Sequence, residues 1–173
     1  MTVAAIALDK MMRRLTEDDR AAMRKATPAH LVDQFDAATD EVDQVIAGIG
    51  HDLDASLGEC TYANVPDWLR LALADTWHGF TTGSIDTCMH QPVVTRPQPV
   101  VAAVWHRNLI VCTACTHLTQ AVGVADRICD CCGRVCAGLP GDGIHACSLG
   151  FGPLLFFYGL CRRCMADHAE ATS

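Results

Sequence analysis

Apolar side chains recur every three or four positions between residues 28 and 49, which predicts an amphipathic helix. Thr27 and Pro28 suit the start of this helix, and Gly48 and Gly50 suit its end. The apolar period is about 3.5 residues, which is typical of helices that pack on helices. We therefore expect a helical neighbour in the same chain, with a homodimer through helix 28–49 as the alternative. The stripe consists of Leu31, Phe35, Ala38, Val42, Val45 and Ile49.

Two further helices are indicated before residue 82. Thr16 and Asp19 have the spacing of a capping box, so a helix should begin after Thr16. Residues 64–80 form another helical pattern, in which Pro66 suits the start and Gly79 the end. We expect its core-facing side chains to be Trp68, Leu71, Ala72 and Trp77.

The pattern changes to short strands and turns after residue 82. Residues 100–106 and 109–112 read as the two strands of a hairpin, and residues 144–161 read as a second hairpin that turns at Gly152 and Pro153. The sequence therefore predicts an α+β protein with two parts. Residues 1–82 form a helical region, and residues 83–173 form a small module rich in β-hairpins.

Composition favours a soluble chain in a reducing compartment. The chain contains no run of 18 apolar residues, and its N-terminus lacks the order of features found in a secretory signal. We therefore expect a cytoplasmic protein without a membrane segment. Eleven cysteines in such a compartment favour metal binding over disulfides, and an odd count rules out a fully bridged monomer.

Most of these cysteines lie in close pairs with the spacing of metal ligands. The pairs are separated by 21, 13 and 28 residues, and two of these gaps contain the predicted hairpins. Pairing in sequence order would give two tetrahedral zinc sites per chain. The alternative is a cross-braced arrangement that pairs the first with the third and the second with the fourth. The first site would use Cys88, His90, Cys112 and Cys115, and the second would use Cys129, Cys132, Cys161 and Cys164.

From residue 86 to residue 166 the chain resembles two zinc ribbons in tandem. The segment Cys129–Gly133 is similar to the C-x2-C-G knuckle of that class, with Gly133 suited to a left-handed turn. The first pair departs from the class, because it is C-x-H instead of C-x2-C. The resemblance implies structural zinc, and zinc ribbons often bind nucleic acid or the machinery of transcription and translation.

Four cysteines fall outside the pairs: Cys60, Cys131, Cys136 and Cys147. Cys131 or Cys136 could replace a knuckle ligand, and either could serve a zinc-thiolate redox switch if its pKa were lowered. A small buried side chain is the simpler interpretation of Cys147. An iron–sulfur cluster is a further alternative use of the paired cysteines.

Catalytic signatures are missing from the sequence. We find no H-x-E deaminase motif, H-E-x-x-H motif, P-loop, G-x-S-x-G or dinucleotide fingerprint. Each proposed zinc site also has four protein ligands, whereas a catalytic zinc keeps one position open. We therefore expect a non-catalytic protein, and an enzyme with an unrecognised site stays as the alternative.

Charge bears on the kind of partner. Residues 1–87 hold 7 basic and 15 acidic residues, whereas residues 88–173 hold 6 arginines and 5 acidic residues. Because phosphate binding depends on clustered Lys and Arg, this balance favours a protein partner over nucleic acid. The partner surface would lie on acidic helix 28–49 or around Arg162 and Arg163, the one basic cluster. The protein would then be an adaptor or regulator, and its Arg and Ala bias suggests an actinobacterial or phage origin.

Overall fold

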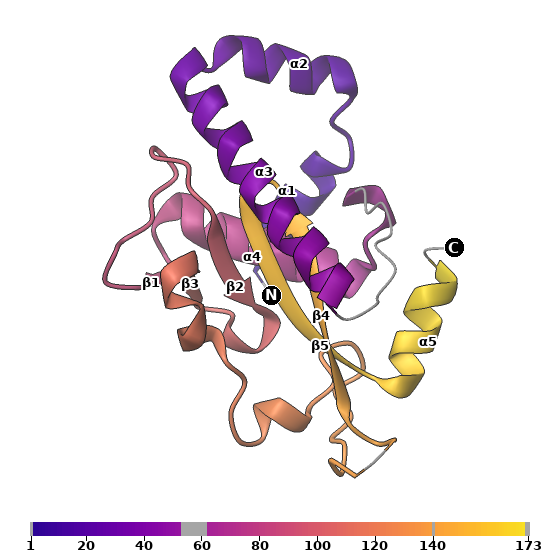
Figure 1. Cartoon of the computed structure of the whole chain (residues 1–173). Coiled ribbons are helices and arrows are strands. Elements are labelled where there is room, and N and C mark those ends of the chain that lie inside the picture. Colours follow the sequence, from indigo (N-terminus) through magenta and orange to yellow (C-terminus); the bar gives the residue numbers. More distant parts are fainter. Residues whose placement is uncertain (1, 53–61, 140, 172–173) are drawn as a thin grey trace.

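The computed structural model describes residues 2–52, 62–139 and 141–171 of the chain, and it has the predicted α+β composition (Figure 1). Four helices precede the strands: α1 (Val3–Met12), α2 (Glu17–Ala26), α3 (Ala29–Asp52) and α4 (Asp67–Thr82). The strands are β1 (Asp86–Thr87), β2 (Val100–Ala103), β3 (Leu109–Cys112), β4 (Ile144–Phe151) and β5 (Leu154–Cys161). Helix α5 (Arg162–Ala171) follows, and short 3-10 turns include η2 (Val104–His106) and η3 (Thr113–Thr119).

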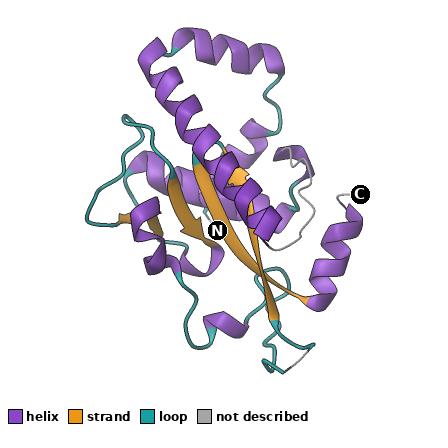
Figure 2. Cartoon of the chain, viewed as in Figure 1, coloured by secondary structure: helices purple, strands orange, loops and turns teal. Residues whose placement is uncertain are grey.

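The five strands form one mixed sheet in the order β1-β3-β2-β5-β4 (Figure 2). Antiparallel hairpins β2–β3 and β4–β5 are joined through β2 and β5, which run parallel with Val100 level with Leu154. The predicted hairpin over 144–161 is confirmed, with its turn at Gly152 and Pro153. The predicted strand 100–106 is too long, because residues 104–106 form a 3-10 turn.

Helices cover both faces of the sheet. Side chains alternate between faces along a strand, so neighbouring residues of β2 and β5 enter different cores. One core combines Leu69 and Leu73 of α4 with Val100, Ala102, Leu154 and Phe156. The other combines Val42 of α3 with Val101, Val111 and Leu155. The result is a three-layer arrangement with the sheet in the middle.

In the part of the chain that the structure describes, the apolar stripe of helix α3 packs on the sheet, which corrects the expectation of a helical neighbour. Ala38 and Val42 are buried, and α3 contacts β4 and β5. Val45 is 39% exposed, since Ile46 takes the inward position one turn after Val42. A Cβ at Gly150 of β4 would lie 2.7 Å from Cδ1 of Ile46, so glycine lets the helix approach the strand.

The ends of α3 also differ from the prediction. Thr27 does not cap this helix, because its hydroxyl donates to the carbonyl of Met23 in α2 over 2.9 Å. The carbonyl of Pro28 accepts the N–H of Val32 instead, and the helix continues past Gly48 and Gly50 to Asp52. A glycine inside a helix costs only about 1 kcal/mol of stability. The packing of α3 on the sheet can offset this cost, so the helix extends past both glycines.

Helix α4 packs against both the sheet and α1, so more of its surface is buried than the sequence predicts. Leu69 and Leu73 are its most deeply buried side chains, whereas Trp68, Ala72 and Trp77 are partly buried at the edge of that core. Gly79 lies inside the helix, which ends at Gly83 in the left-handed conformation. Helix α4 and the sheet share one core. The domain boundary near residue 82 stays a prediction.

A buried ion pair fastens α1 to α4. The guanidinium of Arg70 donates to Asp9 Oδ1 over 2.5 Å, to Asp67 and to the carbonyl of Val65. Tyr62 donates its hydroxyl to the same Asp9 oxygen over 3.0 Å, and burial together with this carboxylate raises the pKa of Tyr62. Helix α2 differs, because no side chain in it is buried, although the predicted capping box of Thr16 and Asp19 is present.

Candidate metal centres

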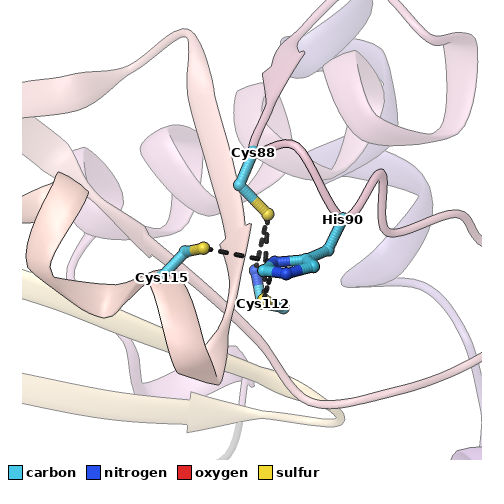
Figure 3. A group of neighbouring side chains, drawn as sticks. All are labelled: Cys88, His90, Cys112 and Cys115. Atoms are coloured by element: carbon cyan, nitrogen blue, oxygen red, sulfur yellow. Dashed lines mark hydrogen bonds between the residues drawn. The ribbon is translucent and has the colours of Figure 1, made fainter.

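The first candidate centre gathers three thiols and one imidazole. Cys88 and His90 lie in the loop after β1, Cys112 ends β3, and Cys115 lies in η3, so that all four side chains point to one spot (Figure 3). Sγ of Cys88 and Cys112 are 3.8 Å apart, and Nδ1 of His90 is 3.3 Å from Sγ of both Cys112 and Cys115. All donor atoms lie within 4.8 Å of one another.

The second candidate centre consists of four thiols. Cys129 and Cys132 come from the loop before β4, Cys161 ends β5, and Cys164 lies in the first turn of α5. Sγ of Cys132 and Cys161 are 3.9 Å apart, and the four sulfurs lie within 4.8 Å of one another. The structure thus groups the eight predicted ligands in sequence order, and it does not bring the cross-braced pairs together.

The spacing of the sulfurs fits a tetrahedral metal ion. Zn–S bonds of about 2.3 Å at tetrahedral angles place neighbouring sulfurs about 3.8 Å apart. The separations of 3.8 and 3.9 Å match this edge, and they are far longer than the S–S bond of about 2.05 Å in a disulfide. Each group could therefore hold one metal ion through four protein donors.

The turns that carry the first two ligands of each centre share one feature, a left-handed residue directly after the second ligand. Gly133 has φ +71° and donates its N–H to the carbonyl of Cys129 over 2.8 Å. Gln91 has φ +45° and donates its N–H to the carbonyl of Cys88 over 2.9 Å. The C-x-H pair therefore lies on a turn of the same kind as the C-x2-C pair, with one residue fewer between its two ligands.

Backbone amides distinguish the thiols within each centre. Burial raises the pKa of Cys88, but N–H groups of Cys112 and His90 outweigh it and bring that pKa down to about 7. Burial likewise opposes ionisation of Cys129, and N–H groups of Cys161, Cys132 and Cys131 bring its pKa down to about 7. Burial and the neighbouring thiols raise the pKa of Cys115 to about 11. Backbone amides thus favour the thiolate form of Cys88 in the first centre and of Cys129 in the second.

The two centres lie at opposite ends of the sheet. Cys112 is level with Val100 and Leu154 at the start of β5, whereas Cys161 is the last residue of β5. Seven residues of strand separate these levels by about 23 Å at 3.3 Å per residue. Cys88 and Cys115 belong to the core beneath α3, and Cys129, Cys161 and Cys164 belong to the core beneath α4. Each centre therefore belongs to a different hydrophobic core.

The remaining cysteines occupy different environments. Cys131 is exposed beside Cys132, Cys136 is buried, and Cys147 lies with its Sγ 3.7 Å from Sδ of Met165. Desolvation raises the pKa of each of these three thiols, to about 11 for Cys147. Cys60 lies outside the described residues. Arg162 and Arg163 are exposed at the start of α5, next to the second centre.

Sequence reasoning missed Asp130, which fixes the second knuckle to the sheet. Its N–H donates to the carbonyl of Gly159 over 2.9 Å, and its Oδ2 accepts the N–H of Gly159 over 2.6 Å. A single aspartate between two cysteines gives no periodic signal, because its partner lies 29 residues later in the chain. Only the folded geometry identifies this role.

Comparisons with known proteins found no match to this chain among family models, curated proteins or solved structures. Among the described residues, no helix has the length and apolar character needed to cross a membrane.

Proposed function

We propose that this chain is a non-catalytic protein that holds two structural zinc ions and recognises another macromolecule. The observation that carries the proposal is the complete set of four donors in each centre. A catalytic zinc usually has three protein ligands and a water, so a tetrahedral ion with four protein donors has no position for substrate. In such sites the metal contributes folding free energy.

Zinc is the metal that best suits these donors. Three thiols with one imidazole, and four thiols alone, are the usual sets of structural zinc. Thiolate-rich tetrahedral sites also hold iron in some proteins, so metal identity is the first point to test. The ten described cysteines are all free thiols, which supports placing the protein in the reducing cytoplasm.

A protein is the partner that the surface favours. Large apolar side chains stand exposed on loops, with Met89, between Cys88 and His90, at 87% and Leu139 at 65%. The chain has a net charge of −7, which opposes binding to phosphate backbones. Acidic residues of α3, including Asp33 and Asp40, are exposed and suit a basic protein partner.

The alternatives have less support. Redox sensing through Cys131 or Cys136 would need an accessible thiolate, whereas Cys136 is buried and desolvation raises the pKa of both thiols. Nucleic-acid binding would rest on Arg162 and Arg163, and Arg134, which follows the second knuckle, is already paired with Asp142 over 2.7 Å. Catalysis at one of these metal ions would need an open coordination position, which the four-donor groups do not provide.

Cobalt substitution tests the structural role of the metal. We expect the spectrum of the Co²⁺ protein to show tetrahedral, thiolate-rich ions that do not change when azide or cyanate is added. An exogenous anion that alters the spectrum would reveal an open coordination position and would contradict a purely structural role.

The partner is tested by charge reversal on α3. The Asp33→Lys/Asp40→Lys variant should lose a protein that co-purifies with the chain from the cells that naturally express it. The Asp126→Lys/Asp167→Lys variant makes the same change in charge on other exposed positions, and it should retain that protein. Equal recovery with both variants would exclude α3 as the partner surface.

A further inference from the structure

The outer face of α1 is apolar and exposed to solvent. On its inner side the helix packs against α4, with Ala5 and Asp9 buried. Eight of the ten residues of α1 are apolar, and a helix that is apolar on all sides is normally buried on all sides. The apolar side chains of the outer face are instead exposed, by 85% for Val3 and 50% for Met11. This outer face consists of Val3, Ile6, Ala7 and Met11.

The two ends of α1 lie beside opposite charges. Arg13 and Arg14 follow the helix, and both are exposed. At the other end the hydroxyl of Thr2 donates to Oδ1 of Asp75 over 2.8 Å, which places a carboxylate of α4 beside the first turn of α1. Among the described residues, none of these three charged side chains takes part in an ion pair. A partner that covers the outer face could therefore neutralise charge at both ends.

The outer face of α1 is symmetric about Ala7. Val3 lies four residues before Ala7 and Met11 four residues after it, and residues at this spacing lie on the same side of a helix. When a second α1 packs antiparallel on the first, Ala7 meets Ala7 of the second copy, and Val3 meets Met11. The small side chain at the centre allows a close approach of the two axes. Lys10, which borders this face, can keep its ammonium in water while its stem covers apolar surface.

The charges suit the same antiparallel arrangement. Reversing the direction of the second helix brings its C-terminal end next to the N-terminal end of the first. Arg13 and Arg14 of each copy then lie beside Asp75 of the other, at both ends of the contact. A twofold interface uses one surface patch on both molecules, so the patch must complement itself in shape and in charge. The outer face of α1 meets both conditions, whereas a purely acidic or purely basic partner would suit only one end.

We propose that α1 is the interface of a homodimer, in which two copies pack antiparallel about a twofold axis at Ala7. Each α1 is then buried between α4 of its own chain and α1 of the second copy, which accounts for the apolar residues on both of its sides. The proposal goes beyond the recognition of another macromolecule, and it does not depend on which metal the centres hold. It also places the dimer contact on α1 and not on α3.

Sedimentation equilibrium of the full, metal-loaded chain tests the interface. The unmodified protein should form a dimer. Ala7→Glu places two carboxylates against each other across the axis, so we expect it to raise the dissociation constant by about a hundredfold or more. Ala22→Glu makes the same change at an exposed position of α2 and is the matched control, with an unchanged dissociation constant.

Two results of this experiment would overturn the proposal. An unmodified protein that stays monomeric up to about 100 µM has no dimer of useful affinity, and the outer face of α1 must then serve a different protein. A dimer that Ala7→Glu leaves intact, or that Ala22→Glu weakens equally, uses another surface of the chain.

An exchange of charges tests the antiparallel direction. Arg13→Glu/Arg14→Glu and Asp75→Lys should each weaken the dimer about tenfold or more at low ionic strength, because like charges then face each other at both ends. An equal mixture of the two variants should restore a dimer that contains one copy of each, since opposite charges meet at both ends again. Formation of this mixed dimer also shows that both variants are folded. A mixture that remains monomeric would contradict the antiparallel interface.

Discussion

The backbone N–H of Cys161 donates to Sγ of Cys129 over 3.3 Å, which joins the last residue of β5 to the first knuckle ligand of the second centre. The first centre repeats this contact, because the N–H of Cys112 donates to Sγ of Cys88 over 3.4 Å. In both centres the residue that ends a hairpin thus supplies a ligand and stabilises the thiolate of another. Each hairpin thereby connects two distant parts of the chain at one point.

Gln91 should be replaceable by glycine with a gain in stability. Its φ of +45° lies in the left-handed region, which costs a residue with a Cβ about 1 kcal/mol relative to glycine. We therefore expect Gln91→Gly to raise the free energy of unfolding by about 1 kcal/mol, measured by urea denaturation of the zinc-loaded protein. Gly133→Ala is the reciprocal change and should lower it by a similar amount. Stability unchanged in both variants would show that these turns relax without cost.

Asp9 should contribute strongly to stability through its buried contact with Arg70. Asp9→Leu leaves the guanidinium of Arg70 with the exposed Asp67 but without its buried carboxylate, and it removes the acceptor of the Tyr62 hydroxyl, so it should cost about 3–5 kcal/mol in chemical unfolding. Asp36→Leu removes an exposed carboxylate, which Arg24 contacts over 2.6 Å, and should have a much smaller effect. Similar losses in the two variants would contradict the special role of the buried pair.

The number of protons released when zinc binds should change near pH 7 in both centres. The lowered pKa values mean that Cys88 and Cys129 are already thiolates above about pH 7 and must lose a proton to bind metal below it. Below that pH, protons compete for every thiol, so apparent zinc affinity should fall more steeply as pH falls. Calorimetry in buffers of different ionisation enthalpy counts these protons, and a count that stays constant from pH 6 to pH 8 would contradict the assignment.

The grouping of the ligands was accessible to sequence reasoning because it depends on local order. Close pairs such as Cys161 and Cys164 place two donors on one turn, and the length of β4 and β5 determines which turns meet. The hairpin over 144–161 followed from its alternating residues and its turn at Gly152 and Pro153. These features need only near neighbours in the chain.

Features that depend on residues far apart in the sequence could not be predicted from the sequence alone. The parallel pairing of Val100 with Leu154 joins the two hairpins, and no local pattern signals a contact of 54 residues. The stripe of α3 was assigned to a helical neighbour because a period near 3.5 does not reveal whether a helix or a sheet covers it. In the same way, Arg70 reads as a surface residue until Asp9 is placed beside it.

The central claim is that the chain holds two metal ions in two separate centres of four donors. Native mass spectrometry, with elemental analysis of the same sample purified without chelator, tests it directly. The account predicts two zinc ions per chain, one ion after Cys88→Ser, and none when Cys88→Ser and Cys129→Ser are combined. A single ion in the unmodified protein, or iron in place of zinc, would contradict it.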